Sequence, residues 1–138
     1  MNEILEQARG VLRSQPFSVL LGADLVAFST DVVELHLPIT EKLTQHHGFV
    51  HGGVVSYAAD NALTFAGGAA LGPAVVTSEY KINYLRPARG ETLIARASIV
   101  YAGRTQAICR CDVFARSNGE DVLCAVAQGT IAPLSAPK

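Results

Sequence analysis

Apolar residues follow two different rhythms along this chain of 138 residues. Between residues 54 and 66 nearly every side chain is apolar or small. This run predicts one long helix over residues 52–70, closed by Gly67, Gly68 and the Gly72-Pro73 pair. A helix that is apolar on nearly every face needs burial on nearly every side.

Most of the remaining chain alternates apolar and polar side chains, which is the period of a half-buried strand. Val33, Leu35 and Leu37 are an example, and Asn118-Gly119 is a strong signal for a tight hairpin turn. In chain order the pattern predicts a helix over 2–13, a short helical turn over 16–21, a hairpin over 25–37, a loop over 38–49, the long helix, and strands over 74–85, 92–101, 105–113 and 122–131. The predicted fold class is α+β, with a curved antiparallel sheet wrapped around a long central helix in one domain, residues 1–138.

Composition narrows the function classes. Hydrophobic residues make up 49% of the chain and charged residues 17%, which argues against disorder. A net charge of −1 provides no basic field for nucleic acid or for an anionic membrane. The N-terminal stretch has the pattern of an amphipathic helix rather than of a signal peptide, and no apolar run reaches the ~20 residues that span a bilayer. We therefore expect a cytoplasmic protein whose partners include neither nucleic acid nor a membrane.

The cysteines and histidines offer little independent chemistry. Cys109, Cys111 and Cys124 contain no CxxC pair, and we interpret them as small buried apolar residues in a reducing compartment. A nucleophilic cysteine is the alternative. Histidines 46, 47 and 51 lack the separated pairs that are usual in metal sites, so we expect no metal.

Asp60 is the only ionisable carboxylate in the predicted long helix. Burying a carboxylate is costly unless it has a partner or a task. Gly52 stands where the helix begins, and a helix start presents free backbone N–H groups and a partial positive charge. The separation from Gly52 to Asp60 corresponds to about 12 Å of helix rise, so one small reacting group cannot touch both within one chain. Two antiparallel chains could share such a site; alternatively, Asp60 is a polar residue on an exposed or capping edge.

Three short motifs carry a resemblance to a known family. The first is Gly48-x-x-His51-Gly52-Gly53 with Asp60 downstream. The second is the stretch TSEYKINYLRPA over residues 77–88, which contains a Tyr-x-x-Pro element, and the third is Gly103-Arg104. From about Val33 to Ile131 the chain resembles the hotdog-fold acyl-CoA thioesterases, specifically their phenylacetate-pathway branch.

The resemblance implies a hotdog fold and a homodimer or homotetramer with active sites shared between subunits. It implies that the backbone N–H of Gly52 is the oxyanion donor and that Asp60 of the partner chain is the catalytic carboxylate. Gln45 and Thr64 match a related arylcarboxyl-CoA branch, which usually has Glu at the Asp60 position. Thr77 matches the phenylacetate-like branch, so the chain mixes features of both.

The implied reaction is hydrolysis of an aryl- or short- to medium-chain acyl-CoA, with no cofactor besides the coenzyme A of the substrate. Asp60 either attacks the carbonyl or removes a proton from water. Gln45 holds the attacking water or the thioester oxygen, Thr64 orients the carboxylate, and Thr77 positions the water. The alternatives are a hotdog hydratase or dehydratase and a non-catalytic acyl-CoA-binding protein.

The remaining candidates are expected to bind substrate. Gly53 lets the substrate approach the backbone without a side-chain clash. His51 is either a base or, as we favour, a loop residue whose ring binds the loop backbone. We expect the phosphates of coenzyme A to contact Arg86, Arg89 and Arg104, and the wall of an acyl pocket to include some of Phe49, Val50, Tyr57 and Phe65.

Overall fold

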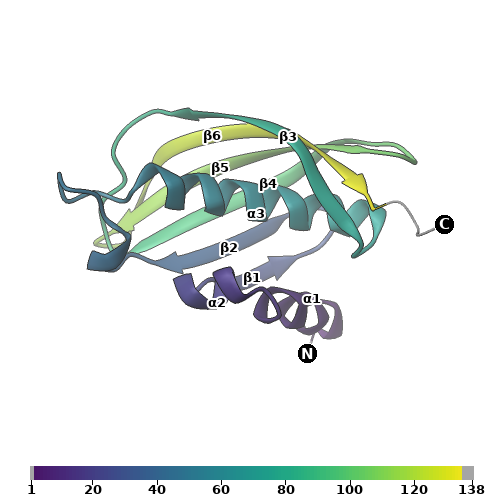
Figure 1. The fold of residues 1–138 in the computed structure, drawn as a ribbon, viewed down its shortest axis with the longest axis horizontal. Coiled ribbons are helices and arrows are strands. Elements are labelled where there is room, and N and C mark those ends of the chain that lie inside the picture. The colour runs from purple at the N-terminus through teal and green to yellow at the C-terminus, as the bar shows by residue number, and fades with distance from the viewer. Residues whose placement is uncertain (1, 135–138) are drawn as a thin grey trace.

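A computed structural model describes residues 2–134 and shows one curved antiparallel sheet with a long helix against its concave face (Figure 1). The sheet order is β1-β2-β4-β5-β6-β3, with β1 (Asp24–Phe28), β2 (Val33–Pro38), β3 (Val75–Tyr84), β4 (Thr92–Ala102), β5 (Ala107–Ser117) and β6 (Glu120–Pro133). The helices are α1 (Glu3–Arg13), α2 (Pro16–Leu21) and α3 (Gly52–Leu71), and a short 3-10 turn (Glu41–Leu43) lies in the loop before α3. The predicted fold class is confirmed. No helix within residues 2–134 is long and apolar enough to cross a membrane.

The predicted hairpin turns form where the sequence places them. Asn118 and Gly119 both have positive φ, 52° and 80°, which is the requirement of a type I′ turn between β5 and β6. The predicted break in the first hairpin separates β1 from β2, and the Ser29 amide donates to the carbonyl of Val32 across that turn at 3.0 Å. Local turn chemistry therefore sets the ends of these strands.

α3 buries one side against the sheet and leaves another side partly open. Its buried residues are Val55, Ala58, Ala59, Ala62, Leu63, Phe65, Ala66 and Gly67. Ser56, Asp60 and Thr64 follow one another at helical spacing and are only half-buried. We call these three residues the open stripe. The sequence predicts burial on nearly every side of this helix. In the single chain, only the side of α3 that faces the sheet is fully buried.

Gly67 and Gly68 lie inside α3 and do not close it, which corrects the prediction. The helix continues to Leu71, and Gly72 follows it with a φ of 100°. A Cβ at position 67 would lie 2.4 Å from the Cβ of Ile131 in β6, so glycine is what lets the helix approach the sheet this closely. A Cβ at position 68 would meet only Val75, at an ordinary 3.6 Å.

Replacing Gly67 with alanine is expected to destabilise the fold although alanine is the better helix former. The forced separation from Ile131 should cost about 1–3 kcal/mol, more than the ~1 kcal/mol of helix propensity that alanine gains. Gly68→Ala is the matched control, because its Cβ fits and it should be neutral or stabilising. Urea unfolding at one fixed protein concentration measures both. Equal stabilities for the two variants would contradict the close-packing explanation.

The three cysteines are free and buried, as predicted. Burial raises the pKa of Cys109 to about 11, and it also raises the pKa of Cys111 and of Cys124. Because the thiolate is the nucleophilic form, these thiols stay protonated and unreactive near neutral pH. The interpretation of the cysteines as packing residues is therefore the one that the fold supports.

Candidate active site

Asp60 stands in a short chain of hydrogen bonds that links α3 to β3. The Thr77 hydroxyl donates to Oδ1 of Asp60 at 2.7 Å. Thr64 Oγ1 lies 2.8 Å from the backbone carbonyl of Asp60 and 2.7 Å from Thr77 Oγ1. Since the single Thr77 proton is used on the carboxylate, the single Thr64 proton goes either to the Asp60 carbonyl or to Thr77 Oγ1. Oδ2 of Asp60 receives no hydrogen bond from residues 2–134, so one carboxylate oxygen is held and the other is left to act.

A β-bulge lies directly beside Thr77. In the pairing of β3 with β6, Thr77 lies opposite Ile131 and Glu79 lies opposite Thr130, so Ser78 is an extra residue in β3. Bulges of this kind bend a strand and re-aim its side chains, and they are frequent next to active sites. The side chain of Thr77 faces α3, and the bulge shifts the pairing of β3 by one residue immediately after it.

Gly52 supplies the free amide that a helix start is expected to offer. The next three amides of α3 are all occupied by His51: the Gly53 N–H donates to its Nδ1 at 2.8 Å, and those of Val54 and Val55 donate to its carbonyl at 2.9 and 3.3 Å. The Gly52 N–H has no acceptor among the described residues. One uncommitted donor therefore remains at the positive end of the helix dipole.

A cavity of about 320 Å³ adjoins this end of α3. Gly52, Phe49, Val50 and Arg86 contribute to its lining, together with Tyr84 at the end of β3. The Tyr84 hydroxyl donates to the Gly52 carbonyl at 3.1 Å, which fixes the peptide next to the free amide. Tyr84 is a site residue that the sequence reasoning missed, although it is the tyrosine of the Tyr-x-x-Pro element.

Gly52 and Asp60 belong to one continuous helix, as the sequence predicts. Their separation along its axis is about 12 Å at the ordinary rise per residue. A single chain thus presents two incomplete halves of a site, an amide donor near Tyr84 and a carboxylate near Thr77.

Gln45 and His51 both serve the loop before α3. Gln45 Oε1 accepts a hydrogen bond from the backbone N–H of His47, and its own backbone bonds to Phe49 and Gly48 at 2.9 Å each. The NH₂ of its side-chain amide has no partner within residues 2–134 and is free to meet a substrate. Because His51 Nδ1 accepts from Gly53, the ring caps the helix, which supports the structural role over that of a base.

The three candidate arginines do not lie together. Arg86 borders the cavity beside Gly52, and the Arg89 guanidinium lies 5.2 Å from the ring centre of Phe49, so both are at the N-terminal end of α3. Arg104 lies in the turn between β4 and β5. That turn adjoins the pair Ala107–Ile131, which is at the other end of α3. In one chain, only Arg86 and Arg89 are placed to meet the same ligand.

The four expected pocket residues also separate. Phe49 and Val50 line the cavity beside Gly52, whereas Phe65 lines a different cavity beside Thr64. Tyr57 faces α2 instead, where its hydroxyl donates to the buried Ser18 at 2.6 Å. Tyr57 is therefore a packing residue in this structure.

Comparison with known proteins agrees with this geometry. The family model of the Thioesterase superfamily matches residues 47–122, a range that contains Gly52, Asp60 and Thr77. A putative esterase from Haemophilus influenzae is 31% identical over 117 residues, which cover 83% of this chain and 83% of that protein. Acyl-coenzyme A thioesterase PaaI from Escherichia coli is 27% identical over 100 residues, covering 72% and 71%. The crystal structure of a thioesterase family protein from Silicibacter pomeroyi has a TM-score of 0.89 at 34% identity and covers 95% of this chain and 98% of that one.

The curved sheet around a long central helix is the hotdog fold, and the comparisons identify a thioester hydrolase. The chain belongs to the thioesterase superfamily. The resemblance noted from the sequence is confirmed at this level, and the similarity to PaaI supports the phenylacetate-pathway-like branch.

Proposed function

We propose that this protein hydrolyses aryl- or short- to medium-chain acyl-CoA thioesters to the free acid and coenzyme A. The observation that carries the proposal is the Asp60 carboxylate, whose Oδ1 is held by Thr77 and whose Oδ2 has no partner among residues 2–134. A carboxylate fixed through one oxygen presents the other in a defined direction. That is what a general base toward water or a nucleophile toward a carbonyl requires.

The chemistry divides between the first residue of α3, Gly52, and Asp60 near its middle. Water, activated by Asp60, adds its oxygen to the thioester carbonyl, or Asp60 Oδ2 adds first and water then cleaves the resulting anhydride. In both cases the C–S bond breaks and the coenzyme A thiolate leaves and takes up a proton. Negative charge develops on the carbonyl oxygen, and the free Gly52 N–H stabilises it.

The two half-sites meet if two copies pack with their α3 helices antiparallel. The amide of Gly52 from one copy then lies beside Asp60 of the other, across the open stripe. A two-fold arrangement of this kind repeats the same contact twice and gives two equal sites. A homodimer, alone or within a homotetramer, is therefore part of the proposal.

The free edge of β3 supports that arrangement. β3 is the last strand of the sheet, runs for 10 residues, and pairs only with β6 in the described part of the chain. An unpaired strand edge of this length invites a further strand. At the opposite edge β1 has only 5 residues and is covered by α1, whose Arg9 donates to the carbonyl of Leu25. Pairing of β3 with its own copy would bring the two open stripes together.

The coenzyme A end of the substrate is proposed to lie over the cavity beside Gly52. Arg86 and Arg89 are exposed there and suit phosphate groups. A cytoplasmic location belongs to the same proposal and is supported by the three free cysteines. A phenylacetate-type aromatic degradation role is supported by the relationship to PaaI.

A panel of coenzyme A thioesters tests the proposal. Purified protein is incubated with benzoyl-, phenylacetyl-, hexanoyl- and palmitoyl-CoA, and free thiol release is measured. Crotonyl-CoA is included, with the absorbance of its double bond followed in parallel. We expect thiol release from aryl and short- to medium-chain substrates. Hydration of crotonyl-CoA without thiol release would identify a hydratase, and binding without turnover would identify a binding protein; either result would overturn the proposal.

Replacing Thr77 with valine is expected to lower kcat about 10- to 100-fold with little change in stability. Valine keeps the shape of threonine but removes the hydrogen bond to the carboxylate, and a bond to a charged group contributes about 1.5–3 kcal/mol. Thr77→Ser is the matched control, because it keeps the hydroxyl and should retain most activity. Steady-state kinetics and thermal melting measure both variants. A Thr77→Val enzyme as fast as the serine variant would show that this hydrogen bond does not orient Asp60.

A further inference from the structure

Two hydroxyl groups meet between α3 and β3, which runs beside the helix in the opposite direction (Figure 1). Ser56 of the open stripe and Tyr80 of β3 share a hydrogen bond, and both side chains are half-buried. The extra residue Ser78 makes the contact possible, because plain alternation from Thr77 would turn Tyr80 away from α3. Neither hydroxyl has another partner among residues 2–134. The pair uses one of its two protons internally, so one donor remains for a group outside the chain.

Ser56 is midway between Gly52 and Asp60 in α3. Steps of four residues place all three on one face of the helix, about 6 Å apart along its axis. If two copies of this helix pack antiparallel around a two-fold axis, with Gly52 of one facing Asp60 of the other, then the residue midway between them faces its own copy. The shared active site therefore places Ser56, with Tyr80 beside it, on the axis.

A hydroxyl group suits a position on a two-fold axis because it both donates and accepts. Two copies of a hydroxyl can hydrogen-bond to each other, whereas two carboxylates would repel. An axis at Asp60 would bring two carboxylates together. An axis at Ser56 instead places each Asp60 near the free amide at the positive end of the other helix. The polar groups of the open stripe thus favour one register.

The charges on β3 agree with the same axis. Glu79 and Lys81 flank Tyr80, are exposed, and lie on the sheet face away from α3. Neither forms an ion pair within residues 2–134. Thr130 donates to Oε2 of Glu79 at 2.5 Å, which leaves Oε1 without a partner there. If β3 pairs antiparallel with its own copy and the pairing is centred on Tyr80, Glu79 of each copy lies opposite Lys81 of the other, and opposite charges in such positions attract.

We propose that Ser56, Tyr80, Glu79 and Lys81 form the contact that sets the register of a two-fold dimer of this chain. The hydroxyls of Ser56 and Tyr80 meet their own copies on the axis, and Glu79 of each copy pairs with Lys81 of the other. The inference rests on the shared site of the proposed function and adds the residues that align its two halves. A slip of two residues along β3 moves one copy about 7 Å along the other, which is enough to part the amide from the carboxylate.

Exchanging charges at the strand edge tests the pairing. Glu79→Lys makes positions 79 and 81 both basic, and Lys81→Glu makes both acidic, so each variant repels its own copy and attracts the other. The two variants, one of them isotope-labelled, are mixed and allowed to exchange subunits. We expect native mass spectrometry to show at least about four-fifths heterodimers, against roughly half for random pairing, because charged contacts act mainly on the choice of partner. The double variant Glu79→Lys/Lys81→Glu restores opposite charges and should pair with itself as the wild type does.

The matched control mixes Glu120→Lys with Lys42→Glu. Both residues are exposed, one at the start of β6 and the other in the 3-10 turn before α3. These changes have the same signs as the test changes but lie outside β3, so we expect roughly half heterodimers. A preference in the control equal to that of the test pair would show that net charge, and not the contact of Glu79 with Lys81, selects the partner.

Substitutions at Ser56 test the axis itself. Ser56→Asp would bring two carboxylates together, whereas Ser56→Asn has the same size, is uncharged, and can donate and accept. We expect the dissociation constant of the Ser56→Asp dimer, measured by dilution in the analytical ultracentrifuge, to exceed that of the Ser56→Asn dimer at least about tenfold. Circular dichroism verifies that both variants are folded.

Random pairing of the two charge variants, or equal dissociation constants for the two Ser56 variants, would overturn this contact. These measurements use no substrate, so they are separate from the test of hydrolysis. If heterodimers prevail and no thioester is cleaved, the proposed hydrolysis fails and the dimer contact stands. If thiol is released while the charge variants pair at random, the hydrolysis stands and the contact fails.

Discussion

Replacing Asp60 with asparagine is expected to lower kcat for acyl-CoA hydrolysis about 10²- to 10⁴-fold, the usual contribution of a positioned acid–base group. Asparagine has the same size, and its carbonyl oxygen can still accept the Thr77 hydroxyl hydrogen bond. What it lacks is a basic oxygen at the Oδ2 position. The fold should therefore persist, and thermal melting should show a transition close to that of the wild type.

A matched change elsewhere controls for loss of charge alone. Asp31 is exposed in the turn between β1 and β2, at the sheet edge opposite β3, which carries Thr77, and Asp31→Asn should leave kcat unchanged. Thiol release from the preferred acyl-CoA and thermal melting are measured for both variants. Hydrolysis by Asp60→Asn at near the wild-type kcat would remove Asp60 from the chemistry and, with it, the proposed mechanism.

Local sequence signals predict most of the fold because they act within a few residues. The apolar run over 54–66 predicts α3, and Asn118-Gly119 predicts the β5–β6 turn, whose two positive φ angles few other residue pairs adopt. Alternation predicts the strands because one face of the sheet is buried against α3. These features need no knowledge of which distant segment lies alongside.

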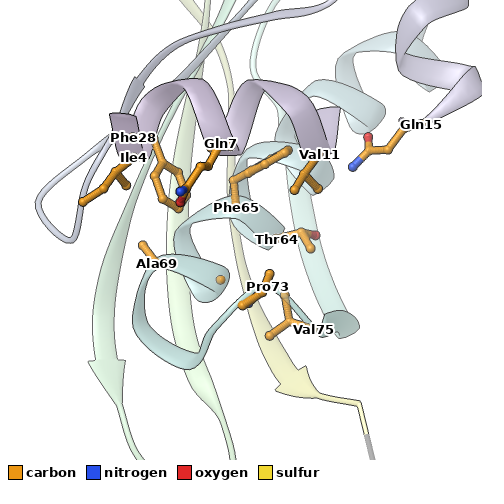
Figure 2. Close-up of a pocket in the computed structure, with 12 residues that line it drawn as sticks. Ile4, Gln7, Val11, Gln15, Phe28, Thr64, Phe65, Ala69, Pro73 and Val75 are labelled. Atoms are coloured by element: carbon orange, nitrogen blue, oxygen red, sulfur yellow. The ribbon is translucent and has the colours of Figure 1, made fainter. Parts of the chain in front are cut away.

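The features that sequence reasoning misses depend on distant contacts. Gly67 has the pattern of a helix breaker, but the close approach of Ile131, far along the chain, makes glycine necessary inside α3. The Ser78 bulge depends on the register between β3 and β6. The cavity between α1 and the C-terminal half of α3 (Figure 2) depends on how the two helices pack, which residue periodicity does not specify.

The residues of the candidate site also fall into those that local spacing predicts and those that depend on distant contacts. Asp60 and Thr64 are four residues apart on one helix, so their proximity follows from helical spacing alone. Thr77 joins them only because β3 passes beside α3, and its place in the sequence prediction came from family resemblance. Tyr84, which holds the Gly52 peptide, carries no local signal beyond its motif. Arg104 fits its motif, yet it lies at the opposite end of the sheet from Arg86 and Arg89.

Replacing Gly52 with proline is expected to lower kcat about 10²- to 10³-fold, because it deletes one oxyanion donor. Proline suits the first position of a helix and lacks the N–H. The preceding residue, His51, already has φ −59° and ψ 136°, a conformation that proline accepts from its neighbour. Gly52→Ala is the control, since it keeps the N–H and its Cβ would lie an ordinary 3.6 Å from Tyr84. Equal activity of the proline and alanine variants would exclude this amide as the donor.

Mixing the two inactive variants tests whether the site is shared. In a heterodimer of Asp60→Asn with Gly52→Pro, one site combines the intact Gly52 of the first chain with the intact Asp60 of the second, and the other site carries both changes. After random subunit exchange we expect about a quarter of the wild-type activity, since half of the dimers are mixed and each has one good site. Mixing Asp60→Asn with the double variant Asp60→Asn/Gly52→Pro should restore nothing. If heterodimers form, as mass spectrometry of native complexes can verify, and activity stays absent, then Gly52 and Asp60 of different chains do not act together. A mass by light scattering equal to the single chain's 14.6 kDa would exclude the dimer directly.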